Sequence, residues 1–175
     1  ILAERNHRRL TLEVDILGMP QILDGRKLAE KILKEIKSKV AELGKSLRLA
    51  MVIVGEDPVV RKFVEQKKKK AQEAGIDIRI YPFPEAITTN ELRKRLAEIV
   101  HEENNHGVIV QLPLPASINS QYILNAVTPE KDVDMLSAKA LGNFVVGKSE
   151  IMSPVAGAVK AFWEEYKISY KNKHI

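Results

Sequence analysis

Apolar positions along the chain follow either a helical spacing or short continuous runs. The segment Arg26–Leu43 has a helical period, and Asp24 and Gly44 are placed to begin and end a helix there. The continuous run Leu49–Val54 then predicts a buried strand. The apolar face predicted for the first helix consists of Leu28, Ala29, Ile32, Leu33, Ile36, Val40 and Leu43.

A second helix follows from Pro58 to Ala74, with Asp57 as its cap and Gly75 as its stop. The next predicted elements are a strand with Ile76, Ile78 and Ile80, a helix from Thr88 or Thr89 to about Asn104 with the core residues Leu92, Leu96, Ile99 and Val100, and a strand at Gly107–Val110. Alternating strands and helices with continuous apolar strands predict an α/β fold, a three-layer parallel sheet with helices on both faces.

The rest of the chain is less regular. Prolines hold Gln111–Pro115 as an extended loop, Ser120–Val127 reads as a short helix, and Ala138–Val146 is ambiguous. The last features are a polar loop at Thr128–Asp134, a helix from Pro154 with Val159, Phe162, Trp163 and Tyr166 as anchors, and a possible strand start at Lys171–Ile175.

The first 18 residues are interpreted as an extension of unknown origin, because Met19 reads like a natural start. They lack a signal-peptide pattern, and Leu10–Ile16 alternates like a strand.

Composition narrows the classes of function. The 175 residues are 45 % apolar and 29 % charged, which is typical of one globular domain. The sequence contains no run of eighteen apolar residues that would predict a membrane span. It has no cysteine, which excludes disulfides and thiolate metal sites and fits a reducing compartment. A cytoplasmic location is therefore expected, with a eukaryotic organelle left open.

Charge adds little. The net charge is +5, and Lys67–Lys70 is the dense basic cluster, which is better explained as a solvated helix face than as a nucleic-acid patch. No metal site is predicted, because His7, His101, His106 and His174 are scattered without ligand spacing.

The candidate chemistry lies where the first strand turns into the second helix. Phe63 and Lys67 are four residues apart and share one helix face there. The alternatives are that Lys67 is simply one solvated lysine among four and that Phe63 packs in the core.

Four motifs together resemble the bifunctional methylenetetrahydrofolate dehydrogenase/methenyltetrahydrofolate cyclohydrolase family. They are Ile22–Gly25, Val52–Pro58, Gly107–Pro115 and Pro129–Asp134. The last two match the family's two most specific motifs, and both occur in the family's order and at its spacing. The resemblance extends over about Met19 to Ile168.

The resemblance implies a folate-binding catalytic domain at 19–153, with 154–175 as a connecting helix and the start of a second domain. In that family the second, Rossmann domain holds NADP or NAD, and this chain ends where that domain would begin. No glycine-rich turn suited to a pyrophosphate occurs here, so the chain alone is expected to bind no nicotinamide cofactor in the family's way. Homodimers are typical of the family, whereas membrane and nucleic-acid partners are not expected.

The resemblance also implies roles for individual residues. Lys67 is the expected catalytic residue of the cyclohydrolase step, and burial would help it to exchange a proton. Gln111 would hold the lysine amine. Phe63 replaces a family tyrosine and can stack on the folate without its hydroxyl.

The loop residues of the two specific motifs complete this expected site. Asp134 would accept hydrogen bonds from the pterin ring, whereas Asp132 would stabilise its own turn. Leu112 and Pro113 are expected to bind the substrate.

Three departures from the family pattern stand beside these matches. Val60 replaces a serine, Met135 replaces a glycine and should resist a positive φ, and Met152–Gly157 matches a conserved segment only at its last glycine. All three are interpreted as changes at ligand-facing positions.

Two functions therefore stay open. One is a one-carbon enzyme that keeps mainly the cyclohydrolase site, in which dehydrogenase activity is not expected. The other is a weak or inactive folate-binding or dimerisation module. Nucleic-acid binding through the lysine cluster is the weakest alternative.

Overall fold

The computed structural model describes residues 22–149 and 151–169. The extension at 1–18, with its strand pattern, and the strand start expected at 171–175 lie outside these residues. The elements in chain order are α1 (Gly25–Leu43), β1 (Leu47–Val54), α2 (Pro58–Glu73), β2 (Ile76–Phe83), α3 (Thr89–His101), β3 (Gly107–Val110), α4 (Ser120–Leu124), α5 (Ala138–Val145) and α6 (Pro154–Glu165).

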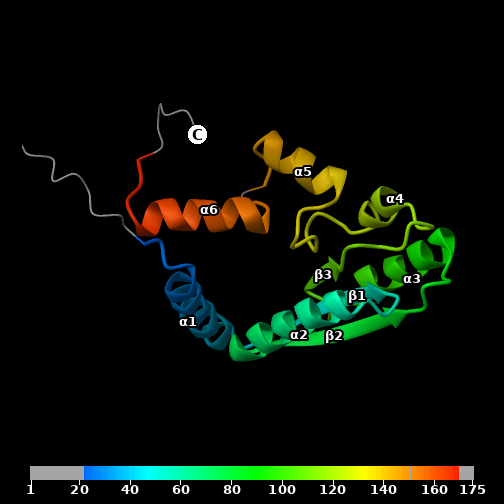
Figure 1. The fold of residues 1–175 in the computed structure, drawn as a ribbon, viewed down its shortest axis with the longest axis horizontal. Coiled ribbons are helices and arrows are strands. Elements are labelled where there is room, and N and C mark those ends of the chain that lie inside the picture. The colour runs from blue at the N-terminus through cyan, green and yellow to red at the C-terminus, as the bar shows by residue number, and fades with distance from the viewer. Residues whose placement is uncertain (1–21, 150, 170–175) are drawn as a thin grey trace, which may run out of the picture.

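The described strands form one parallel sheet in the order β2-β1-β3 (Figure 1). Leu47 pairs with Ile76 where β1 meets β2, and Leu49 pairs with Gly107 where β1 meets β3. Because all the strands run the same way, their carboxyl ends lie at one edge, where the loops Gly55–Asp57 and Gln111–Pro115 begin.

Each face of the sheet is covered by a different helix. Ala50 and Val52 of β1 pack with the buried face of α3, whereas Met51 between them packs with Val60 and Val64 of α2. This alternation follows from the two-residue period of a strand. The predicted three-layer α/β architecture is confirmed. The buried face of α3 is Leu92, Leu96, Ile99 and Val100, as the sequence predicts.

Capping residues explain the element boundaries. The Asp24 carboxylate accepts hydrogen bonds from the first turn of α1, and Gly44 ends that helix at φ 61°. Thr88 and Glu91 form a reciprocal capping box at the start of α3. Gly75 follows α2 at φ 80°, as expected for a stop residue.

Some boundaries differ from prediction by one or two residues: β1 begins at Leu47 instead of Leu49, and α2 ends at Glu73 instead of Ala74. Three further differences concern α3, α4 and α5. α3 ends at His101 instead of Asn104, because side chains take over its last carbonyl groups. α4 ends at Leu124 instead of Val127, since the next residues form tighter turns. The ambiguous segment beginning at Ala138 is a helix, capped by the Ser137 hydroxyl.

The helices α1 and α6 lie to one side of the sheet (Figure 1). Of the apolar face predicted for α1, only Leu28 is buried, and Leu43 is 56 % exposed. No residue of α6 is buried. The two helices are joined instead by polar contacts: the Tyr166 hydroxyl accepts a hydrogen bond of 2.8 Å from the Asp24 N–H, and the Lys31–Glu165 ion pair measures 2.6 Å.

Candidate active site

The turn between β1 and α2 sets the direction of α2. The Gly55 N–H donates to the Phe83 carbonyl oxygen over 2.9 Å, and Gly55 has a φ of 79° that suits glycine. The Asp57 carboxylate then accepts hydrogen bonds from Val59 and Val60 N–H at 2.6 and 3.2 Å. This cap and the buried side chains of α2 fix the helix over the sheet, so the residues farther along it have defined positions.

Lys67 extends from α2 to the end of β3. Its Nζ donates to Gln111 Oε1 over 3.0 Å, and the lysine is half-buried. Gln111 is itself held, because its Nε2 donates to the Leu112 carbonyl at 2.7 Å and its N–H donates to Val52 O at 2.9 Å. The lysine–amide contact expected from the sequence is present, and the amide oxygen is fixed toward the amine.

Apolar side chains near these two residues face solvent. Phe63 lies one helical turn before Lys67 and is 54 % exposed. The alternative that Phe63 packs in the core is therefore wrong. Leu112 is 36 % exposed, Pro113 is also exposed, and the peptide bond between them is cis. These residues leave apolar surface open to a ligand.

Asp134 brings a carboxyl group into the electrostatic field of Lys67. Burial raises the pKa of this half-buried group above its ordinary value, the Lys67 charge partly offsets the rise, and the Asp132 charge adds to it. Asp132 is buried and accepts from the N–H groups of Leu136 and Ser137 at 3.3 and 2.8 Å. The predicted turn role of Asp132 is confirmed.

Two of the three sequence departures are not at ligand-facing positions. Val60 and Met135 are each 6 % exposed, and Val60 packs against the sheet. The expectation that Met135 resists a positive φ is also wrong for this turn, because Met135 adopts a φ of 52°. Burial of its side chain and the hydrogen bonds to Asp132 hold this turn.

A cavity of about 370 Å³ lies beside this site, at the carboxyl ends of β1 and β3. Pro113 and the carboxylate residues Glu56, Asp57 and Glu85 line it. A larger cavity of about 510 Å³ lies between the end of β2 and α3, and none of the predicted site residues lines it.

No cluster of three or more potential metal ligands occurs within 22–149 and 151–169. His101 and His106 are exposed and bond to nearby backbone, His101 Nδ1 with Ala97 O at 2.7 Å and His106 Nδ1 with the Arg48 N–H at 3.2 Å. His7 and His174 lie outside the described residues. Over the described ranges, no helix has the length and apolar character needed to cross a membrane.

Sequence reasoning missed two residues that support the site. Lys131 reaches from the Asp134 loop to the end of α3, and the fully buried Asn105 fixes that helix end. For Asn105 the available signal was its position, because a polar residue between the end of a helix and a buried strand has orphan carbonyl groups within reach. The sequence carried no such signal for Lys131.

Known proteins are similar to this chain in both sequence and fold. Residues 23–134 match the family described as tetrahydrofolate dehydrogenase/cyclohydrolase, catalytic domain. The bifunctional protein FolD of Nautilia profundicola is 39 % identical over 157 residues, covering 88 % of this chain and 55 % of that protein.

Solved structures that resemble this chain come from the same kind of enzyme. A 5,10-methylenetetrahydrofolate dehydrogenase from Bombyx mori has a TM-score of 0.82 at 31 % identity, covering 86 % of this chain and 53 % of that one. The Trypanosoma brucei methylenetetrahydrofolate dehydrogenase-cyclohydrolase, solved with NADP and an inhibitor, has a TM-score of 0.81 at 29 % identity, with coverages of 89 % and 55 %. The chain thus spans about half the length of these relatives. By both sequence and fold, it belongs to the tetrahydrofolate dehydrogenase/cyclohydrolase family and corresponds to the family's catalytic domain.

Proposed function

We propose that this chain binds a tetrahydrofolate substrate and hydrolyses its methenyl bridge, as a part of one-carbon metabolism. The observation that carries the proposal is the 3.0 Å hydrogen bond between Lys67 Nζ and Gln111 Oε1, with the Asp134 carboxyl close enough for the lysine charge to act on it. An amine, an amide and a carboxyl group thus meet beside exposed apolar side chains.

The chemistry suits this set of groups. The methenyl carbon lies between two nitrogens that share a positive charge, so water attacks it and a C–O bond forms. The added water loses both of its protons as its oxygen becomes the formyl C=O, and one C–N bond breaks. The departing nitrogen takes up one proton, and the other is released to solvent, so the cationic substrate becomes a neutral product. Lys67 is the residue proposed to pass the proton. In its neutral form the positioned amine accepts a proton from water, and the ammonium that results then donates it to the departing nitrogen.

The other groups hold the reactants. Gln111 keeps the amine directed at the site through its fixed oxygen. Asp134 accepts hydrogen bonds from the pterin ring, Phe63 stacks on the aromatic part of the folate, and Leu112 and Pro113 complete the apolar contact.

We do not assign hydride transfer to a nicotinamide cofactor to this chain, which spans about half the length of its relatives. The relative from Trypanosoma brucei was solved with NADP, but the sequence printed here contains no glycine-rich strand-to-helix turn for a dinucleotide. We place the folate-binding unit at residues 19–153 and the connecting segment at 154–175. A homodimer is proposed from the resemblance alone, and a cytoplasmic location is proposed from the resemblance together with the expectation from composition.

A specific observation favours a second candidate, a folate-binding module without turnover. Phe63 lacks the hydroxyl of the family tyrosine at an exposed position beside Lys67. A lost hydrogen bond is worth about 0.5–1.5 kcal/mol, which corresponds to up to about a tenfold loss of rate or affinity.

Absorbance of 5,10-methenyltetrahydrofolate separates the two candidates. The wild type should hydrolyse it faster than buffer, and Lys67→Ala should lose about 100-fold or more of the added rate. Lys69→Ala is the matched control, because Lys69 is exposed on the same helix. Equal rates for wild type, Lys67→Ala and buffer would exclude catalysis, and retained binding would then favour the module.

A further inference from the structure

The loop that carries Asp134 runs along the outer edge of β3. The Val108 N–H donates to the Lys131 carbonyl oxygen over 2.7 Å, and Val108 and Asp132 form an isolated parallel bridge. Val133, the next residue, packs against the core cluster under α2. The backbone of this loop therefore follows the sheet, and its position depends on what holds it there.

The side chain of Lys131 connects the loop to a different element. Its Nζ donates to Val100 O at 2.7 Å and to Glu102 O at 3.0 Å. Val100 lies in the last turn of α3, and Glu102 is the C-cap residue of that helix. Carbonyl groups at this end have no partner within the helix, and the end carries a partial negative charge, so an ammonium group binds there favourably.

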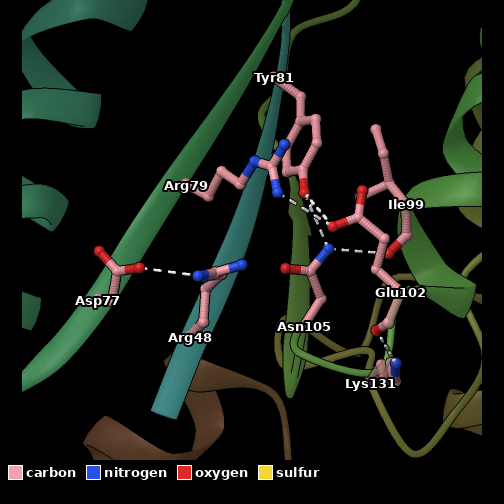
Figure 2. Close-up of polar contacts among 8 residues, drawn as sticks. All are labelled: Arg48, Asp77, Arg79, Tyr81, Ile99, Glu102, Asn105 and Lys131. Carbon is pink, nitrogen blue, oxygen red and sulfur yellow. Dashed lines mark hydrogen bonds and ion pairs between the residues drawn. The ribbon is translucent and has the colours of Figure 1, made fainter. Parts of the chain in front are cut away.

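The end of α3 is held by a network of side-chain hydrogen bonds. The buried Asn105 Nδ2 donates to Ile99 O at 2.9 Å and to the Tyr81 hydroxyl at 3.1 Å. Tyr81 donates in turn to the Glu102 carboxylate at 2.8 Å, which also pairs with Arg79 of β2 at 3.3 Å. Figure 2 shows this network converging on Glu102, with Lys131 at the backbone of the same residue.

Asp134 is fixed only through its neighbours. It makes no hydrogen bond to another group in the described part of the chain. The loop is held before Asp134 by the contact of Lys131 with α3, and after Asp134 by the hydrogen bond from the Ser137 N–H to the Asp132 carboxylate. The groups whose charges act on Asp134 are Lys67 from α2 and Asp132 from its own loop.

We propose that Lys131 is a positioning residue, whose amine binds the end of α3 and thereby holds Asp134 toward Lys67 and a bound folate. Its effect on folate rests on the proposed function, whereas its effect on the geometry of Asp134 does not. Lys131 touches neither the substrate nor the reacting atoms in this scheme.

Three variants test the role. Lys131→Met keeps the aliphatic stem and removes the amine, Lys131→Arg keeps a cation, and Lys139→Met is the matched control at an exposed lysine of α5. Lys131→Met should raise the KM for 5,10-methenyltetrahydrofolate about tenfold, which corresponds to the loss of one hydrogen bond from a charged group. The kcat should change less than about twofold. Lys131→Arg should recover part of the loss, and Lys139→Met should match the wild type.

A second measurement needs no substrate. NMR titration of the Asp134 carboxyl carbon, assigned by comparison with Asp134→Asn, should give a lower pKa in Lys131→Met, because a released loop exposes the group to water. If Lys131→Met does not fold, Lys131→Gln removes the charge instead and should lower the pKa of Asp134 in the same direction, whereas Lys131→Arg should stay closer to the wild type. An unchanged Asp134 titration would overturn the positioning role, even where stability falls, and would leave Lys131 as a helix cap alone. If the wild type has no folate activity, the proposed function fails, while the titration still decides the role of Lys131.

Discussion

Gly107 is the position where one added methyl group tests the packing between sheet and loop. A Cβ there would lie 2.7 Å from Leu49 Cδ2 and 2.7 Å from Val133 Cγ1. The end of a leucine side chain can rotate away, but a β-branched valine is stiff, so the loop itself must move. Since Gly107 has no positive φ, the cost of Gly107→Ala arises from this contact and not from backbone conformation.

The magnitude follows from overpacking. Forcing an extra methyl group into a filled core costs about 1–3 kcal/mol. In a domain of this size, a loss of about 2 kcal/mol lowers Tm by about 4–8 °C. Val133 precedes Asp134 in the chain, so the affinity for 5,10-methenyltetrahydrofolate should fall together with the stability.

Thermal unfolding followed by circular dichroism measures this effect. Gly142→Ala is the matched control, because Gly142 lies in α5 with nothing within 4 Å of its added Cβ. That change should be neutral or stabilise by up to about 1 kcal/mol, since alanine is the better helix former. A Gly107→Ala protein with the Tm of the wild type, beside a control that behaves as expected, would refute the reasoning.

Two further predictions concern the core and the site. Leu96→Ala removes a fully buried side chain of α3 and should lower the free energy of unfolding in urea by about 2–5 kcal/mol, and a loss below about 1 kcal/mol would contradict this packing. Asp134→Asn should raise Tm at pH 7. Burial raises the pKa of Asp134 in the folded state above the ordinary 3.8, so the folded protein binds more protons than the unfolded one and loses stability as the pH rises through the folded pKa. The gain should disappear below pH 3.8, and a lower Tm of the variant at pH 7 would contradict the sign.

Much of the fold could be predicted because the local signals agree. The run that forms β1 is continuous and apolar, Asp57 and Pro58 mark the start of α2, and α3 buries the face that its spacing predicts. For α1 the periodicity predicted the helix and its ends correctly, but not that most of its apolar face would stay uncovered. A helical period gives the apolar face of a helix and not the partner that covers it.

In the candidate site, too, some contacts could be predicted from the sequence and others could not. The Lys67–Gln111 contact could be anticipated, because the family resemblance implies a role for each residue and the carboxyl ends of parallel strands are where such sites lie. The contacts of Lys131 could not, since they depend on how a loop meets a helix 31 and 29 positions earlier in the chain. Likewise, the sequence makes Met135 look like an obstacle to its turn, and only tertiary burial and the hydrogen bonds of Asp132 explain why it is accommodated.

The contact between Asp24 and Tyr166 joins positions 142 residues apart in sequence at a distance of 2.8 Å. The chain therefore enters and leaves the folded unit at nearly the same point. A unit with this geometry can be inserted into a loop of a host protein, because the host backbone need not stretch to accommodate it. The same closeness permits circular permutation: a short linker can join the chain near Asp24 to the chain near Tyr166, and new termini can then be opened at an exposed loop.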